Sequence, residues 1–193
     1  MVAQRVPREA AVRALSMEVG LVFRAMSTLH LLSGLPCAGK TTYANALKSD
    51  SHAVIFTLDV WLITLFGRYD LAEVGHEEHT RRVLACREVT WSAAAALLVR
   101  STDVILDDGF FFRAHREAYV QRAAMLGATT KIHHLWLPLP RLMARIERRN
   151  QNLPPFNFRI DPVTLSTFAG IYEPPSESEG AEVVDVRNEL TAH

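Results

Sequence analysis

One short segment of the sequence has the residue types and spacing of a phosphate-binding loop. Gly34 to Thr41 match the pattern G-x-x-x-x-G-K-[ST] in full, between an apolar run and a helical pattern. Glycines let the backbone wrap so closely that several N–H groups point at one anion, and the positive end of the following helix adds to the attraction. In such a loop, called the P-loop below, Lys40 can reach the β- and γ-phosphates and the Thr41 hydroxyl can ligate Mg²⁺.

The P-loop predicts that the chain binds ATP and Mg²⁺. The alternative is a Gly-rich turn whose lysine is merely solvated. A cysteine inside the loop is expected to fill space rather than to act as a redox switch. The expected phosphate-binding residues are Gly34, Leu35, Pro36, Cys37, Ala38, Gly39, Lys40, Thr41 and Thr42.

Two neighbouring aspartates follow an apolar strand candidate further along the chain. Val104 to Asp108 has the form of a strand that ends in acids, and ligands of parallel sheets lie outside the carboxyl ends of the strands. We therefore expect Asp107 and Asp108 to face the P-loop. One of the two would hold Mg²⁺, directly or through water, and the other could contact the acceptor. The alternative is a solvated Asp-Asp-Gly turn.

Asp59 is the candidate general base. It follows the strand candidate 52–58, so it should lie at the same edge of the sheet. A kinase needs a carboxylate within hydrogen-bond reach of the acceptor hydroxyl. The alternative role is an N-cap for a helix that begins at Val60 and Trp61, and the two roles are compatible.

Five arginines gather within 19 residues around the loop 150–158: Arg141, Arg145, Arg148, Arg149 and Arg159. Arg145 and Arg149 are four residues apart and share one helix face. Guanidinium groups that close over a nucleotide stabilise the charge of phosphoryl transfer, and a closing segment also excludes water. We therefore predict an Arg-rich lid over about residues 141–160, with Arg145 and Arg149 as its catalytic arginines; the alternative is a solvated basic helix. Arg113 and Arg116 could bind an anionic part of the acceptor or be solvated.

The elements that must position these residues alternate along the chain. Short apolar strands separated by helices predict an α/β fold, a parallel sheet covered on both faces. We expect one domain over residues 26–193, preceded by an N-terminal extension or accessory helix over residues 1–25. The expected strands are 29–32, 52–58, 103–106, 130–137 and 181–186, and the expected helices are 40–48, 79–100, 113–126, 141–149 and 161–172.

The composition is that of an ordinary globular domain. The 193 residues carry 21 basic and 21 acidic side chains, and 49% are hydrophobic. This excludes collagen-like, disordered and disulfide-framework classes. Two cysteines and the absence of a membrane-length apolar run favour a cytoplasmic protein without a membrane partner. The balanced charge makes nucleic acid an unexpected partner.

Together these segments resemble the group of small P-loop kinases that includes polynucleotide 5′-kinases, zeta toxins and chloramphenicol phosphotransferase. The resemblance covers residues 27–186 and rests on the P-loop, Asp59, the segment 104–108 and the arginine-rich segment 145–159. It implies a P-loop NTPase three-layer sandwich with five parallel strands in the order 2-3-1-4-5. Two positions depart from the group: Leu62 stands where an arginine is frequent, and Cys37 replaces a small serine or glycine.

The sequence therefore predicts an ATP-dependent phosphotransferase, which moves the γ-phosphate of Mg·ATP to a hydroxyl of a small-molecule or nucleotide-type acceptor. The alternative is a P-loop ATPase or nucleotide-dependent switch that acts on a protein partner. A toxin acting on a cell-wall sugar nucleotide would be a special case of the kinase. The acceptor and the oligomeric state are left open.

Overall fold

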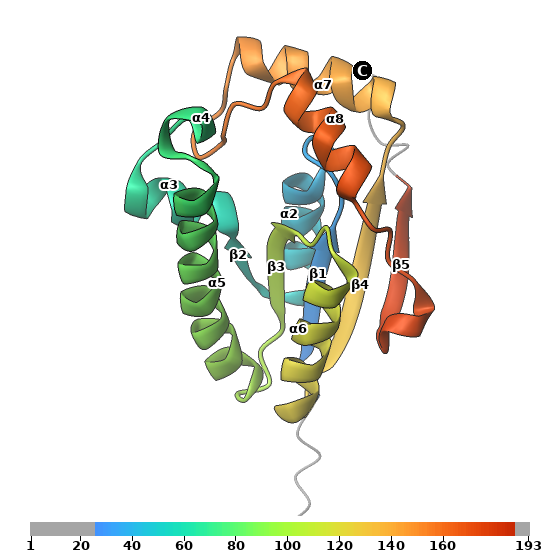
Figure 1. Cartoon of the computed structure of the whole chain (residues 1–193). Coiled ribbons are helices and arrows are strands. Elements are labelled where there is room, and N and C mark those ends of the chain that lie inside the picture. The colour runs from blue at the N-terminus through green and yellow to red at the C-terminus, as the bar shows by residue number, and fades with distance from the viewer. Residues whose placement is uncertain (1–25, 188–193) are drawn as a thin grey trace, which may run out of the picture.

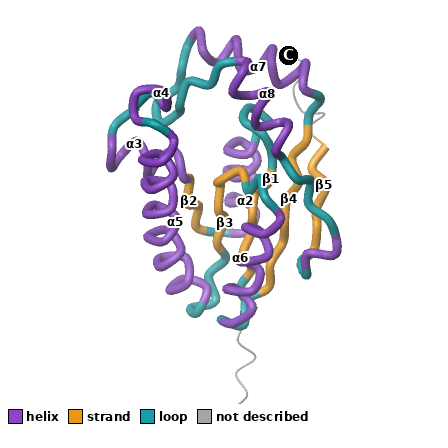
Figure 2. Tube along the Cα trace, in the orientation of Figure 1, coloured by secondary structure: helices purple, strands orange, loops and turns teal. Residues whose placement is uncertain are grey.

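A computed structural model describes residues 26–187 of the chain. The predicted N-terminal extension or accessory helix, residues 1–25, lies outside the described residues. Within the described range the chain alternates between strands and helices, and Figures 1 and 2 show the helices packed around a central twisted sheet.

The sheet has five parallel strands in the order β2-β3-β1-β4-β5, which confirms the order implied by the resemblance. Buried apolar side chains fill β1 and most of β3, as expected for central strands covered on both faces. The strands are β1 (Thr28–Ser33), β2 (Val54–Thr57), β3 (Val104–Gly109), β4 (Thr129–Trp136) and β5 (Glu182–Arg187).

Five of the helices follow the five predicted segments with shifted ends, and the other three are short elements outside those segments. They are α2 (Lys40–Ser51), α3 (Leu58–Phe66), α4 (Leu71–Val74), α5 (His76–Leu98), α6 (Arg113–Met125), α7 (Leu139–Gln151), α8 (Pro162–Ile171) and the 3-10 helix η1 (Glu177–Glu179). The predicted strand 52–58 was too long, because His52 ends α2 and Leu58 begins α3. Asp161 caps α8 through Thr164, as its position before Pro162 indicates.

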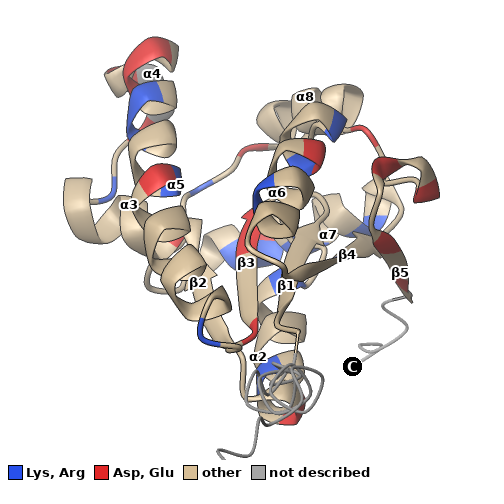
Figure 3. Ribbon diagram, turned by 90° about the horizontal axis from the view of Figure 1, so that it is seen from below, with Lys and Arg blue, Asp and Glu red and all other residues tan. Residues whose placement is uncertain are grey.

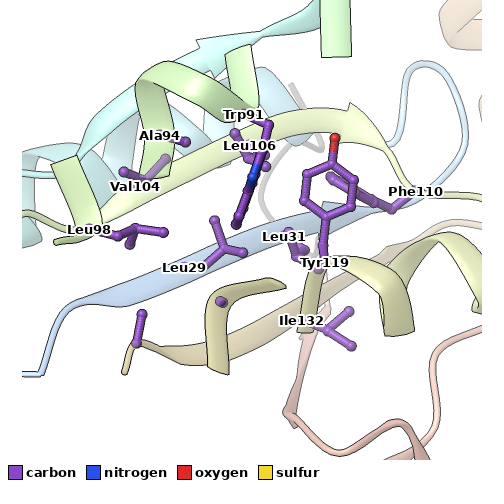
Figure 4. Close-up of a cluster of buried hydrophobic side chains, with 12 residues drawn as sticks. Leu29, Leu31, Trp91, Ala94, Leu98, Val104, Leu106, Phe110, Tyr119 and Ile132 are labelled. Atoms are coloured by element: carbon purple, nitrogen blue, oxygen red, sulfur yellow. The ribbon is translucent and has the colours of Figure 1, made fainter. Parts of the chain in front are cut away.

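Two apolar clusters join the helices to the two faces of the sheet. The first, shown in Figure 4, packs Trp91 and Leu98 of α5 and Tyr119 of α6 against Leu29 and Leu31 of β1. The second sets α2, α7 and α8 against the opposite face. Alternate residues of a strand point to opposite faces, so β1 and β3 contribute to both clusters.

The second cluster contains Ala44 of α2, Leu142 and Ile146 of α7, and Leu165 of α8, all fully buried. The arginine-rich helix α7 is therefore anchored to the sheet through its apolar face. Among residues 26–187, no helix combines the length and the apolar character that crossing a bilayer requires.

Candidate functional site

The P-loop joins the end of β1 to the start of α2, as its motif predicts. A Cβ atom at Gly34 would lie 2.4 Å from the carbonyl oxygen of Leu135, so only glycine fits this close approach to β4. Gly39 precedes α2 with φ 98°, a left-handed conformation that glycine adopts without strain. The Gly34 N–H donates to the carbonyl of Gly109 at 2.9 Å, which fixes the loop against the turn after β3.

Cys37 also has a left-handed backbone, with φ 64°. A non-glycine residue rarely adopts this conformation, and it is frequent at functional loops. Burial raises the pKa of the Cys37 thiol, although Arg149, Lys40 and Arg145 oppose the shift. A thiol that is held protonated fits the space-filling role expected from the sequence.

Lys40 folds back over the P-loop. Its ammonium donates to the carbonyl oxygens of Gly34 and Leu35 at 2.9 and 3.0 Å. Burial lowers the pKa of Lys40, and the charges of Asp107 and Asp59 oppose that shift. The ammonium is therefore held against the P-loop backbone, where the negative charges of Asp107 and Asp59 favour its charged form.

Asp107 lies beside the P-loop helix. Its carboxylate accepts a hydrogen bond of 2.7 Å from the Thr41 hydroxyl, and its side chain faces α2 with only 5% of the residue exposed. This burial rules out the solvated turn as a description of Asp107. Burial raises the pKa of Asp107, whereas Lys40 and the Thr41 hydrogen bond lower it.

The pair Thr41 and Asp107 fits the requirements of Mg²⁺. The ion prefers oxygen ligands and is usually held by one or two protein oxygens together with phosphates and water. The two side chains already place a hydroxyl and a carboxylate oxygen 2.7 Å apart at the mouth of the P-loop. Both could turn to one ion without any movement of the backbone.

Asp108 takes a different direction because β3 is irregular at this point. Leu32 pairs with Asp107 and Ser33 pairs with Gly109, so Asp108 is an extra residue in a β-bulge. Bulges redirect side chains and are frequent beside active sites. Asp108 accepts two hydrogen bonds of 2.7 Å from the guanidinium of Arg87 on α5.

Asp59 lies in the first turn of α3, two residues after the N-cap position Thr57. The alternative role as the N-cap itself is therefore wrong. Burial raises the pKa of Asp59 to about 6; Lys40 and Arg149 oppose this, and Asp107 and Asp108 reinforce it. The pKa values of Asp59, Asp107 and Asp108 all respond to the charge of Lys40, so the four side chains interact electrostatically.

The lid arginines divide into two groups. Arg145 and Arg149 are half-buried, and they donate to the carbonyls of Cys37 and Phe158 at 3.2 Å each. The Nε atom of Arg149 is buried and has no hydrogen-bond acceptor within residues 26–187. The other three, Arg141, Arg148 and Arg159, are exposed, as the solvated alternative predicted for them. Figure 3 marks the acidic end of β3 in red and the basic residues of α7 in blue.

The two arginines considered for the acceptor lie elsewhere. Arg116 is fully buried, and its guanidinium donates to the carboxylate of Glu179 and to the carbonyls of Phe110 and Glu173. Arg113 is exposed and pairs with Glu117 at 2.7 Å. The structure thus gives both guanidiniums partners in α6, in the turn between β3 and α6 and in the segment after α8, and it does not bring them to Lys40 and Asp59.

Two features of the site have no sequence motif. The first is Arg87, which sits in the middle of α5 and meets Asp108 only through the fold. The second is a contact across the site: Tyr69 packs against Phe158 with 5.0 Å between ring centres, and Arg68 donates to the carbonyl of Pro154 at 3.1 Å. The lid is therefore in contact with the segment between α3 and α4.

The fold is that of P-loop kinases. A presumed kinase of Chloroflexus aurantiacus superposes with a TM-score of 0.67 and 18% identity, over 86% of this chain and 87% of that one. Kti12 of Chaetomium thermophilum, in complex with ADP-AlF3, superposes with a TM-score of 0.64 and 15% identity, over 85% of this chain and 91% of that one. Shikimate kinase of Acinetobacter baumannii, in complex with shikimate, superposes with a TM-score of 0.54 and 17% identity, over 88% of each chain.

At these identities the similarity shows the fold alone, and no curated protein matches the sequence significantly. The family model described as an AAA domain matches residues 29–164, which include the P-loop, Asp59, the end of β3 and the lid. Because this match covers well over half of the sequence, the chain belongs to the AAA domain family.

Proposed function

We propose that the protein is a kinase that transfers the γ-phosphate of Mg·ATP to a hydroxyl group of a small-molecule or nucleotide-type acceptor. The observation that carries the proposal is the position of Asp59, which shares one electrostatic site with Lys40 and Asp107. A P-loop that only binds nucleotide has no need of a half-buried carboxylate of raised pKa in the helix turn that follows β2.

Each step of the reaction has a group suited to it. The P-loop amides and Lys40 would bind the β- and γ-phosphates once Lys40 leaves the carbonyls of Gly34 and Leu35. Thr41 and Asp107 would hold Mg²⁺, which would supply positive charge against the negative charge that develops on the phosphate oxygens. Asp59 would accept the proton of the attacking hydroxyl as the oxygen bonds to the γ-phosphorus and ADP leaves.

Arg145 and Arg149 would complete the site from the lid. Their guanidiniums already contact the P-loop carbonyl of Cys37 and the lid carbonyl of Phe158. A γ-phosphate oxygen would offer an acceptor to the buried Nε of Arg149. Charge supplied from the lid would stabilise the transition state only when the lid is closed, and closure would also limit hydrolysis by water.

The alternative is an ATPase or switch that acts on a protein partner. It is supported by the contact between the lid and the α3–α4 segment, because a nucleotide that moves the lid would also move that surface. A switch would release ADP without an acceptor, whereas a kinase would do so only when an acceptor hydroxyl is present.

The test combines an acceptor screen with two variants. Nucleosides, sugars, amino sugars, antibiotics and oligonucleotides are screened for acceptor-dependent release of ADP. Lys40→Ala should abolish binding of Mg·ATP, and Asp59→Asn should leave binding intact and reduce transfer about 100-fold or more. Transfer that persists in Asp59→Asn would remove Asp59 as the base, and acceptor-independent turnover unaffected by that substitution would favour the ATPase.

A further inference from the structure

The ion pair between Arg87 and Asp108 joins α5 to the end of β3, next to the contact between Thr41 and Asp107. Both guanidinium-to-carboxylate distances are 2.7 Å, the geometry of a bidentate pair, and Arg87 keeps 23% of its side chain exposed against 7% for Asp108. Asp108 directly follows Asp107 at the end of β3, and α5, which carries Arg87, packs against α3, which carries Asp59. The pair therefore borders the site at the end of β3, and its net charge is zero.

The other arginines of the elements α3 to α5 are also engaged. Arg81 and Arg82 share the carboxylate of Glu78, and the guanidinium of Arg82 lies 4.9 Å from the ring centre of Phe66 and 4.8 Å from that of Tyr69. Arg68 donates to a lid carbonyl. Residues 58–98 contain four arginines and six carboxylates, and one of these carboxylates, Glu88, pairs with Arg122 of α6, so this side of the site offers no excess of positive charge.

The lid has the opposite balance. Residues 139–160 contain five arginines and one glutamate. The positive charge that a triphosphate requires is thus supplied from the lid and Lys40, and the α3–α5 side adds none to it. Leu62, three residues after Asp59, is 2% exposed, so this position of α3 contributes a core side chain instead of a cation.

We propose that the acceptor is a hydroxyl compound that carries neither a phosphate nor a carboxylate group, and that the Arg87–Asp108 pair selects against anions. The inference rests on the proposed kinase function. Because Asp108 occupies the Nε/Nη2 edge of Arg87 and neutralises its charge, an anionic acceptor would meet a guanidinium that already has a bidentate partner, and it would gain no uncompensated positive charge there. A neutral hydroxyl compound needs only to hydrogen-bond to groups at the edge of the pair.

The experiment measures the affinity for inorganic phosphate by calorimetry in the presence of Mg²⁺ and a non-hydrolysable ATP analogue. Wild type and Asp108→Asn are each measured with and without the additional substitution Arg87→Gln. The difference in phosphate affinity within each pair is the part that depends on Arg87. Wild type and Arg87→Gln should bind phosphate equally weakly. In the Asp108→Asn background the guanidinium is released, and phosphate affinity should exceed that of Asp108→Asn/Arg87→Gln by about tenfold.

Glu78→Gln is the matched control. It releases arginines on the exposed part of α5 and should leave phosphate affinity unchanged. Thermal melting verifies that each variant is folded, and Arg87→Lys, which keeps the charge but loses the bidentate geometry, replaces Arg87→Gln where that variant fails to fold. An affinity in wild type that falls with Arg87→Gln would overturn the proposal, because Arg87 would then bind anions. A gain in Glu78→Gln equal to that in Asp108→Asn, or no gain in Asp108→Asn, would also overturn it.

Binding of the ATP analogue separates this inference from the proposed function. If Lys40→Ala no longer binds the ATP analogue, the P-loop role is supported regardless of the result for phosphate binding. If the wild type does not bind the analogue, the proposed function fails. If it binds the analogue and also binds phosphate through Arg87, only the inference about the acceptor fails.

Discussion

The hydroxyl of Thr41 and the carboxylate of Asp107 meet at 2.7 Å, across the gap between the first turn of α2 and the end of β3. One residue belongs to the P-loop and the other lies 66 positions further along the chain. Since β1 and β3 pair in parallel with Leu32 opposite Asp107, the sheet register itself sets this distance. The neighbouring Asp108 is turned to α5 and takes no part in the contact.

This division of the two aspartates predicts different responses to Mg²⁺. Asp107→Asn should raise the Mg²⁺ concentration needed for half-maximal ATP binding about tenfold or more, because a charged oxygen beside Thr41 is lost. Asp108→Asn is the matched variant and should change it much less. A Mg²⁺ titration of nucleotide binding measures both. A larger effect in Asp108→Asn would assign the metal to the other aspartate.

The pKa of Asp59, raised to about 6, predicts the pH dependence of transfer. A general base acts only when it is ionised, so the rate at low acceptor concentration should fall about tenfold for each pH unit below 6 and level off above it. ATP affinity measured over the same range serves as the control. A midpoint near pH 4 would mean that Asp59 titrates as an ordinary carboxyl group and would contradict the prediction.

The same shift predicts that Asp59 destabilises the folded chain at neutral pH. Between pH 4 and 6 the folded state keeps a proton that the unfolded state has released, so stability falls as the pH rises through this window. Asp59→Asn should therefore raise the free energy of unfolding at pH 8 by at most about 3 kcal/mol, the equivalent of roughly two pKa units. Urea unfolding at pH 8 and pH 4 measures it, and the gain should vanish at pH 4. An equal gain at both pH values would refute the electrostatic cause.

The ring contact between Tyr69 and Phe158 predicts that the α3–α4 segment holds the lid in place. An aromatic pair contributes about 0.5–1.5 kcal/mol, so Tyr69→Ala should increase the open population roughly 2- to 10-fold. Trypsin cleavage after the exposed Arg159, followed by mass spectrometry, should accelerate by that factor. Phe156→Ala, at an exposed position on the same loop, is the control. Equal acceleration in both variants would assign the effect to the loop rather than to the contact.

The sequence was sufficient to predict the architecture and to bring the P-loop residues and Asp107 together. Gly34, Lys40 and Thr41 follow a local spacing, and Asp107 ends an apolar strand, so chain order alone brings them to one edge of a parallel sheet. Arg87 could not be found in this way. Its contact with Asp108 depends on a β-bulge and on which face of α5 packs against the sheet. Neither feature can be predicted from the spacing of neighbouring residues in the sequence.

Arg116 illustrates the other limit of sequence reasoning. Its position after the Asp107–Asp108 segment left acceptor binding and solvation as alternatives, but it is buried, and its partner Glu179 lies 63 residues away in the segment that follows α8. Whether an arginine is solvated, catalytic or buried depends on which distant segment returns to cover it. Here that segment is η1, whose capping box between Ser176 and Glu179 presents the glutamate to α6.

The Arg116–Glu179 pair predicts a large structural effect. Neither side chain has any exposed surface, and the two hydrogen bonds between them measure 2.7 Å. Removing one partner leaves a charge buried without compensation, so Glu179→Gln should cost about 3–5 kcal/mol of folding free energy.

The matched variant is Glu117→Gln, which breaks the exposed pair with Arg113 on the same helix and should have a much smaller effect. The double variant Arg116→Met/Glu179→Leu should recover part of the loss, because it leaves no unpaired charge in the interior. Urea unfolding at pH 7 compares all three. A loss for Glu179→Gln no larger than that for Glu117→Gln would mean that water reaches the pair in solution, and the pair would then not hold η1 to α6.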